Sequence, residues 1–265
     1  MGALKLYIVF LTILFISVSF LGYMFFKAHT DHIVYESIEF QEIPESFRGF
    51  NIFFISDIHR RKIKESTIEK IDQHIDLIII GGDLIERGVP LERMRQNIIK
   101  LKKWRAPIYF IWGNNDFETN INKMKHILMQ ENVIMLEDKI ASIYKDNKKI
   151  NLIGLKYYED RYAEHSVNWN ELKDGFTILC THKPSAFYEL NEAVKKQINV
   201  IFAGHTHGGQ IRIFGFGFYK KGGTFSYQGS TVIISEGYGY TMLPLRLGTR
   251  AECHVVSLQQ NSTNA

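Results

Sequence analysis

The sequence FNIFFISDIH, residues 50–59, joins an apolar run to two polar side chains of the kinds that bind metal ions. Phe50 to Ser56 are almost wholly apolar, which is typical of a strand covered on both faces. Asp57 and His59 follow at once. Because sites in open α/β sheets form beyond the carboxyl ends of strands, this stretch predicts an α/β sheet with a site at one edge.

Four further apolar runs end in the same way. DLIII (76–80) leads to Gly-Gly-Asp, IYFIW (108–112) to Gly-Asn-Asn-Asp, TILC (177–180) to Thr-His, and VIFA (200–203) to Gly-His-Thr-His-Gly-Gly. With the first run, they should bring seven donor side chains to one edge: Asp57, His59, Asp83, Asn114, His182, His205 and His207.

Each motif alone is weak, because a lone Asp-x-His is more often a loop carboxylate beside a surface histidine, and Gly-Gly-Asp is more often a turn. Alternating histidines among glycines are stronger, since the backbone there can come close to a metal. Carboxylate, imidazole and amide oxygen together suit Mn, Fe or Zn, of which we favour Mn. Seven donors exceed the needs of one tetrahedral ion and predict two divalent ions about 3.5–4 Å apart, bridged by one carboxylate.

The segments between these runs predict helices and further strands. One-sided apolar spacing predicts helices at 64–75, 91–101 and 120–130. The runs 140–144 and 150–155 are typical of a hairpin, and further strands are expected at 176–180, 200–203, 232–235 and 254–258. We therefore expect a short connector at 28–49, one domain at 50–258 and a polar tail at 259–265.

Residues 6–26, LYIVFLTILFISVSFLGYMFF, carry no charge. At ~1.5 Å per residue they span about 30 Å, the thickness of a bilayer core. The alternative is a cleaved secretory signal, but its apolar core is usually about 7–15 residues and a small-x-small cleavage site is missing here. We predict that residues 1–27 are a single-pass anchor in the cell membrane. Lys5 and the α-amino group lie before the stretch and only Lys27 lies close behind it, which slightly favours an N-terminus inside and a catalytic domain outside.

Overall charge excludes little else. Lys and Arg total 32 against 28 Asp and Glu, a net charge of +4. So small an excess of positive charge disfavours a nucleic-acid partner. Two cysteines, Cys180 and Cys253, form no disulfide framework.

The ordered set DxH, GGD, GNxD, a lone histidine after a strand and GHTHGGQ resembles the calcineurin-like metallophosphoesterase superfamily over residues 50–258. The segment SEGYGYTMLPLRL, residues 235–247, is similar to the end of a small membrane-associated subgroup, which includes enzymes like UDP-2,3-diacylglucosamine hydrolases. The resemblance implies a metallophosphoesterase-type β-sandwich of two mixed sheets flanked by helices, here preceded by one transmembrane helix.

The resemblance also implies roles for the donors. One ion would be bound by Asp57, His59 and His207, the other by Asn114, His182 and His205, with Asp83 bridging both. A hydroxide held between the ions would attack phosphorus in line. The expected activity is hydrolysis of a phosphodiester or pyrophosphate bond in a phosphorylated substrate. The anchor favours a lipid-linked or cell-envelope precursor, and the alternative is a metal-stabilised binding module with weak or no turnover.

One position departs from the family pattern. Asn115 stands where the family usually has a histidine that assists the leaving group. An amide donates hydrogen bonds but transfers no proton near neutral pH. Because general-acid help is typically worth ~10²–10⁴-fold, three interpretations follow. The leaving group needs no proton, another residue supplies it, or activity is reduced or lost.

Two further segments are candidates for substrate contact. Arg60 and Arg61 directly follow His59, and form either a basic collar for an anionic substrate or an ordinary solvated run. Residues 214–228, FGFGFYKKGGTFSYQ, are rich in glycine and aromatics. They predict a hairpin whose aromatics pack on the sheet, an apolar wall of the site, or a loop that touches the membrane.

Overall fold

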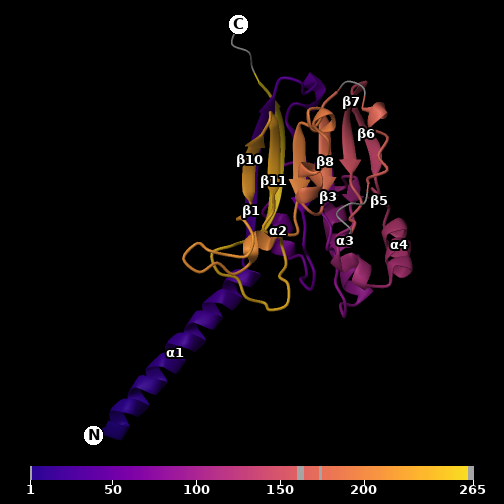
Figure 1. The fold of residues 1–265 in the computed structure, drawn as a ribbon. Helices are drawn as coiled ribbons and strands as arrows, with labels where there is room; N and C mark the ends of the chain where they lie inside the picture. The colour runs from indigo at the N-terminus through magenta and orange to yellow at the C-terminus, as the bar shows by residue number, and fades with distance from the viewer. Residues whose placement is uncertain (1, 160–163, 173–174, 262–265) are drawn as a thin grey trace.

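The computed structural model describes residues 2–159, 164–172 and 175–261, which form a sandwich of two sheets with helices outside and one long N-terminal helix (Figure 1). The first sheet contains β1 (Asp31–Phe40), β2 (Phe50–Ile55), β3 (Leu77–Ile80), β4 (Ile108–Phe110), β5 (Val133–Met135) and β12 (Ala251–Gln260). The second contains β6 (Lys139–Lys145), β7 (Lys148–Gly154), β8 (Thr177–Thr181), β9 (Val200–Ala203), β10 (Gly223–Tyr227) and β11 (Ser230–Ile234).

The helices of the described chain are α1 (Gly2–His29), α2 (Glu65–Glu69), α3 (Leu91–Leu101), α4 (Ile121–Gln130), α5 (Ser185–Tyr188) and α6 (Glu192–Lys195). Single 3₁₀ turns are η1 (Glu45–Phe47), η2 (Lys102–Trp104), η3 (Asn115–Glu118), η4 (Trp169–Glu171) and η5 (His207–Gly209).

Both sheets are mixed, as the resemblance implied. The strand orders are β1-β12-β2-β3-β4-β5 and β10-β11-β9-β8-β7-β6. Neighbours are parallel except for β12–β2, β6–β7 and β10–β11, which are antiparallel. The expected hairpin is therefore confirmed as β6–β7. The prediction of two mixed sheets flanked by helices is also confirmed.

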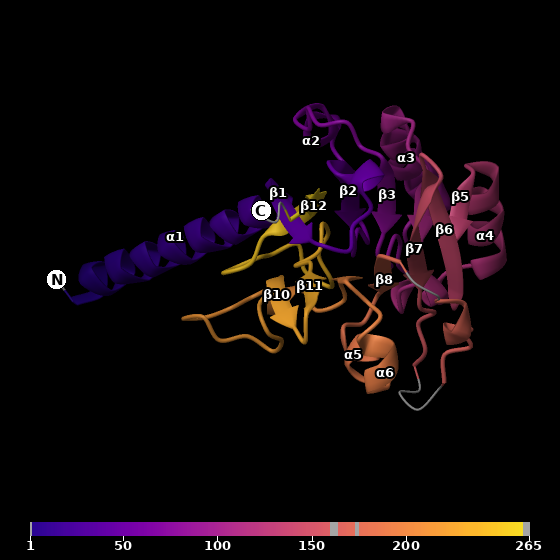
Figure 2. The ribbon, with the colours of Figure 1, turned by 90° about the horizontal axis from the view of Figure 1, so that it is seen from above.

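The packing of strand β2 explains why its residues from Ile52 to Ile55 are all apolar. Phe53 and Ile55 point into a core shared with α2, α3 and α4. Ile52 and Phe54 point into the core between the sheets, where the Phe54 ring lies 4.9 Å from that of Phe202 on β9. Both faces of the strand are covered from Ile52 onward, and its one polar residue, Asn51, lies where the strand is still partly exposed. Figure 2 shows the helices on the outer faces of the sandwich.

The segments between strands differ partly from expectation. Helices α3 and α4 lie where the apolar spacing predicts them, and Asn120 caps α4 by accepting from the backbone N–H of Lys123. The helix expected at 64–75 ends instead at Glu69. Its later apolar positions are buried without helix, because Asp76 pairs with the Asn51 backbone in both directions and draws the chain into β3 beside β2.

The segment 28–49, expected as a connector, contains β1 as an edge strand. Asp31 to Phe40 pair in parallel with Ala251 to Gln260 of β12. Strand β12 therefore also takes in the first two residues of the expected polar tail, and residues 262–265 of that tail lie outside the described residues.

Helix α1 extends away from the sandwich (Figure 1 and Figure 2). Within the described residues it is the one helix long and apolar enough to cross a membrane, and Met24 and Ala28 are its buried residues. The backbone N–H of Arg246 donates to the Met24 carbonyl at 3.1 Å, and the His29 and Tyr240 rings lie 5.4 Å apart. These contacts fix the end of α1 to the loop between β11 and β12.

Candidate metal centre

The seven predicted donor side chains meet at the carboxyl ends of five strands. We call the segments that carry them the donor loops. The first sheet contributes those after β2, β3 and β4, and the second sheet those after β8 and β9. The site thus lies where the carboxyl ends of the strands of both sheets meet. The sequence predicted instead that it lies along the edge of a single sheet.

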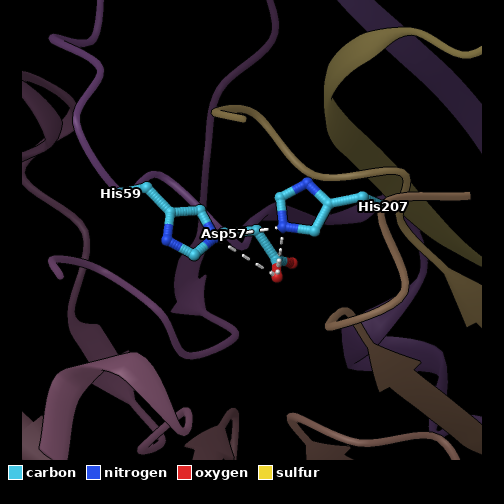
Figure 3. Close-up of side chains that lie close together, drawn as sticks. All are labelled: Asp57, His59 and His207. Atoms are coloured by element: carbon cyan, nitrogen blue, oxygen red, sulfur yellow. Dashed lines mark hydrogen bonds and ion pairs between the residues drawn. The ribbon is translucent and has the colours of Figure 1, made fainter. Parts of the chain in front are cut away.

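One group consists of Asp57, His59 and His207 (Figure 3). The Nε2 atoms of the two histidines lie 3.0 Å apart, and Asp57 Oδ1 lies 3.3 Å from His207 Nε2 and 4.0 Å from His59 Nε2. All three side chains are buried. Ring nitrogens and a carboxylate that point at one another in a buried space are a donor set that a shared cation can satisfy.

The second group consists of Asn114, His182 and His205. Asn114 Oδ1 lies 3.1 Å from His182 Nε2 and 2.9 Å from His205 Nδ1. Asp83 Oδ2 lies 3.3 Å from His182 Nε2 and 3.7 Å from His59 Nε2. This carboxylate therefore stands between the two groups, the place that a bridging ligand needs.

The electrostatics of the site call for added positive charge. Burial opposes the charge of His182, but the carboxylates of Asp83 and Asp57 overcome it and raise the pKa of His182 to about 10. Burial likewise opposes ionisation of Asp83, yet His182 holds the pKa of this carboxyl well below its usual range. Burial lowers the pKa of His207 to about 3, so its ring is neutral. Ionised carboxylates beside a neutral imidazole fit divalent ions.

The backbone of the donor loops is strained. Asp57, His59, Asp83, His205 and His207 all have φ between 48° and 70°. Residues other than glycine pay for this left-handed conformation, and such strain gathers at functional sites. The neighbouring glycine makes the close approach possible, because a Cβ on Gly204 would lie 2.4 Å from Asp57 Oδ2.

Comparison with known proteins identifies the fold and its chemistry. The profile of the family described as calcineurin-like phosphoesterase matches residues 50–209. The chain belongs to this family. It is therefore a metal-dependent phosphoesterase, and the buried Asp and His cluster is where divalent ions fit.

Related sequences come from bacteria and vertebrates. The uncharacterized protein YpbG of Bacillus subtilis is 41% identical over 211 residues, covering 78% of this chain and 80% of that protein. The uncharacterized metallophosphoesterase YkoQ of the same species is 25% identical over 224 residues, covering 77% and 82%. A transmembrane protein with metallophosphoesterase domain from Danio rerio is 25% identical over 261 residues, and the match spans 88% of this chain but 58% of that protein.

A solved structure shows the same fold. The NAD nucleotidase of Haemophilus influenzae superposes with a TM-score of 0.50 at 16% identity, over 72% of this chain and 45% of that one. At this identity the likeness concerns the fold alone.

Two acidic residues that the sequence did not single out support the donor loops of this phosphoesterase. Glu86 Oε2 lies 3.0 Å from His59 Nδ1, which leaves Nε2 facing the site. Asp116 is buried and accepts from the backbone N–H groups of Asp83, Gly113 and Ile85 at 2.9, 2.8 and 3.2 Å. Its place in Gly-Asn-Asn-Asp is the signal that could have marked it.

Asn115 contacts a donor residue. Its backbone N–H and its side-chain Nδ2 donate to the two oxygens of Asp83 at 2.8 and 2.7 Å. It also lines the pocket in front of the donors. Its amide therefore holds the orientation of the Asp83 carboxylate while facing the space that a substrate would occupy.

The two arginines considered for substrate binding are engaged elsewhere. Arg61 is buried, pairs with Asp31, donates to the Tyr238 carbonyl at 2.7 Å and lies 4.3 Å above the Tyr238 ring. This corrects its assignment to the basic collar, because its charge is used in packing β1 against the core. Arg60 pairs with Glu86, so it acts on the site through that carboxylate.

Proposed function

We propose that this phosphoesterase is a two-metal phosphohydrolase that cleaves a phosphodiester or pyrophosphate bond. The observation that supports it most is the convergence of seven donors, with the Asp83 carboxylate between two groups of three. Asp57, His59 and His207 would hold one ion, and Asn114, His182 and His205 the other. When bound, divalent ions make water nucleophilic at neutral pH and neutralise charge on phosphoryl oxygens.

The protein's own residues prepare the site. Glu86 and the Gly81 carbonyl, which lies 2.9 Å from His182 Nδ1, each orient one donor imidazole. Asn115 orients Asp83. A pocket of about 630 Å³ opens in front of these donors and can receive a phosphate ester.

The lining of this pocket offers few proton donors, which favours a leaving group that needs little help from an acid. Among its described residues, the polar side chains outside the seven donors are Asn115, Thr206, Gln210, Tyr219 and Thr241. The amide and threonine side chains transfer no proton near neutral pH, so the Tyr219 phenol is the one member of this set with general-acid chemistry. A phosphate released from a pyrophosphate bond or an aryl oxide leaves without such help, whereas a simple alkoxide does not.

The membrane helix supports a lipid-linked substrate. Helix α1 would hold the site near amphiphilic molecules, and relatives in Danio rerio and Bos taurus are named as transmembrane proteins. The likeness of residues 235–247 to the subgroup of UDP-2,3-diacylglucosamine hydrolases favours a nucleoside-diphosphate lipid or another cell-envelope precursor.

The test is a substrate comparison on the purified full chain loaded with Mn²⁺. We expect turnover of an aryl phosphodiester and of a nucleoside-diphosphate lipid, slower turnover of an alkyl phosphodiester, and loss of all three in Asp83→Asn. Equal rates on the alkyl and pyrophosphate substrates would refute the leaving-group argument. Absence of turnover on every substrate, with metal bound, would favour a metal-stabilised binding module.

A further inference from the structure

Six apolar side chains near the metal centre are exposed to solvent. We call Ile213, Phe214, Phe216, Phe218, Met242 and Leu243 the apolar rim; they lie on the loops between β9 and β10 and between β11 and β12. Phe214 is 95% exposed, Phe218 99% and Met242 85%. Contiguous exposed apolar groups of this kind mark contact with another apolar phase, because they contribute no burial to the fold itself.

The backbone at Phe214 makes the same point independently. Ile213 and Phe216 exchange two backbone hydrogen bonds of 2.9 Å, so Phe214 and Gly215 form the tip of a two-residue hairpin. Both have positive φ, 50° and 85°, as in a type I′ turn. Asparagine or glycine is favoured at the first position, and a bulky aromatic is strained there. Fold stability therefore does not explain a phenylalanine at this tip.

The rim is held in place by polar clamps. The Arg212 guanidinium donates to the carbonyls of Gly208, Gly215 and Tyr219 at 2.8, 2.6 and 2.6 Å. The Gln210 side chain donates to the carbonyls of Thr241 and Leu243 and accepts from the Thr241 backbone N–H. Both loops are thus tied to the segment that carries His205 and His207.

The rim lies beside the membrane helix. In both views its two loops project from the end of the sandwich to which α1 is attached (Figure 1 and Figure 2). The second loop bonds to α1 at Met24, which lies in the last turn of the apolar stretch 6–26. If that stretch fills the bilayer core, this contact sits at the membrane interface. Exposed Lys220 and Lys221 follow Phe218 closely, as suits anionic headgroups.

The rim also borders the metal-site pocket. An apolar groove of about 650 Å³ lies between the two loops, and Phe218, Thr241 and Met242 line both this groove and the pocket of the donors. A molecule lying in the groove would therefore have one end at the donors and the other at the rim.

We propose that the apolar rim inserts into the bilayer in which α1 is anchored, so that the groove opens from the membrane towards the metal centre. The occupant of this surface is the lipid bilayer. As far as catalysis is concerned, the inference rests on the proposed function, because an amphiphilic phosphate ester would then enter by its apolar end from the membrane. Insertion itself requires no catalysis.

Insertion is measured on the full chain in vesicles of phosphatidylcholine and phosphatidylglycerol, with a polarity-sensitive fluorophore on Phe214→Cys. The native Cys180 and Cys253 are fully buried, so labelling is selective. Tyr144→Cys is the matched control, since Tyr144 is an exposed aromatic on β6, the sheet edge opposite β10. We expect lipids with a doxyl group on the acyl chain to quench the label at 214 and not at 144. No quenching at 214, or equal quenching at both, overturns the proposal.

A second variant separates insertion from catalysis. Phe214→Asn creates the favoured Asn-Gly turn and touches neither the groove nor the pocket. We expect unchanged turnover of a soluble aryl phosphodiester and a loss of turnover of a phosphodiester lipid embedded in vesicles. Equal activity of variant and wild type on the embedded lipid contradicts the inference. Should the wild type cleave neither substrate, the proposed function fails, while the quenching result still decides insertion.

Discussion

The donor loops and the apolar rim leave the same end of the sandwich and have opposite physical character. The donor loops bury charged and polar side chains, with Asp57 at 0% and His59 and His182 at 1% exposure. The rim exposes aromatic and aliphatic side chains, with Phe218 at 99%. Both contain residues in the left-handed conformation, His207 in one and Phe214 in the other. In the isolated chain each set of side chains raises the free energy of the fold. Bound cations offset this for the donor loops, and lipid offsets it for the rim.

The largest effect is expected from removing the charge at the centre of the donor loops. Asp83→Asn should lower kcat/KM by about 10³-fold, because the ions it helps to hold supply several kcal/mol of charge stabilisation. Steady-state kinetics with an aryl phosphodiester and metal analysis of the same samples measure this. Asp72→Asn, on an exposed surface carboxylate, is the matched control. An Asp83→Asn variant with normal activity and metal content would show that Asp83 does not join the two groups.

The next effect concerns the leaving group. Asn115→His should raise the rate on an alkyl phosphodiester relative to an aryl one by about 10²-fold, the lower end of general-acid contributions. Asn115→Ala should instead slow both substrates alike, because it removes the side-chain hydrogen bond to Asp83, leaves the backbone one and adds no acid. An unchanged alkyl-to-aryl ratio in Asn115→His would mean that a proton already reaches the leaving group by another route.

A smaller effect is expected one step behind the donors. Glu86→Gln should weaken Mn²⁺ binding by about 10–100-fold, because His59 loses the carboxylate that orients it. Titration of metal-free protein by calorimetry measures the change. Glu92→Gln, at an exposed position of α3, should bind Mn²⁺ as tightly as the wild type does. Equal affinity of Glu86→Gln and wild type would assign Glu86 to pairing with Arg60 alone.

The stability of the fold should depend on pH through His254, which lies on β12 beside β2. Burial opposes the charge of His254, but Glu252 and Glu36 beside it raise the pKa of His254 to about 9. Because the pKa is raised in the folded state, protonated His254 contributes on the order of 1–3 kcal/mol to the free energy of unfolding. This contribution is complete below about pH 6.5 and is lost as the pH rises through 9. His254→Gln should therefore lower the melting temperature at pH 6 and much less at pH 10. The exposed His74→Gln is the control, and a pH-independent loss in His254→Gln would contradict this.

The smallest effect is expected at the rim. Phe214→Asn should leave the free energy of unfolding within about 0.5 kcal/mol of wild type or raise it slightly, because the turn becomes Asn-Gly. Phe202→Ala, a fully buried phenylalanine on β9, should cost about 3–5 kcal/mol. Denaturant titration compares the two. A large loss in Phe214→Asn would show that the rim packs within the fold after all.

Elements buried on both faces were predictable from sequence, whereas an edge strand was predictable only where its partner is next in the chain, as for β6 beside β7. β9 occupies the predicted residues 200–203, because four consecutive apolar residues are all buried when a strand is covered on both faces. Strand β1 was missed since it is an edge strand with exposed Glu39 and a partner far along the chain, Ala251 for Asp31. Pairing over such a separation leaves no local pattern. Strand β10 pairs with its neighbour β11 in the chain, but its side chains are largely exposed and none of its residues is buried.

The candidate site divides in a similar way. Seven donors could be named because each lies within four residues of the end of a buried strand. Glu86 and Asp116 could not be assigned, since their partners His59 and Ile85 are set by how the loops pack. Arg61 was misplaced because adjacency to His59 in sequence says nothing about which side of the backbone a side chain takes. The buried partner Asp31 decides it.

The central claim is that the seven donors hold two divalent ions with Asp83 between them. Anomalous diffraction from crystals of the full chain grown with Mn²⁺ tests it directly. We expect two anomalous peaks per chain, about 3.5–4 Å apart, one beside Asp57, His59 and His207 and the other beside Asn114, His182 and His205. A single peak, or two peaks that Asp83 does not touch, would contradict it.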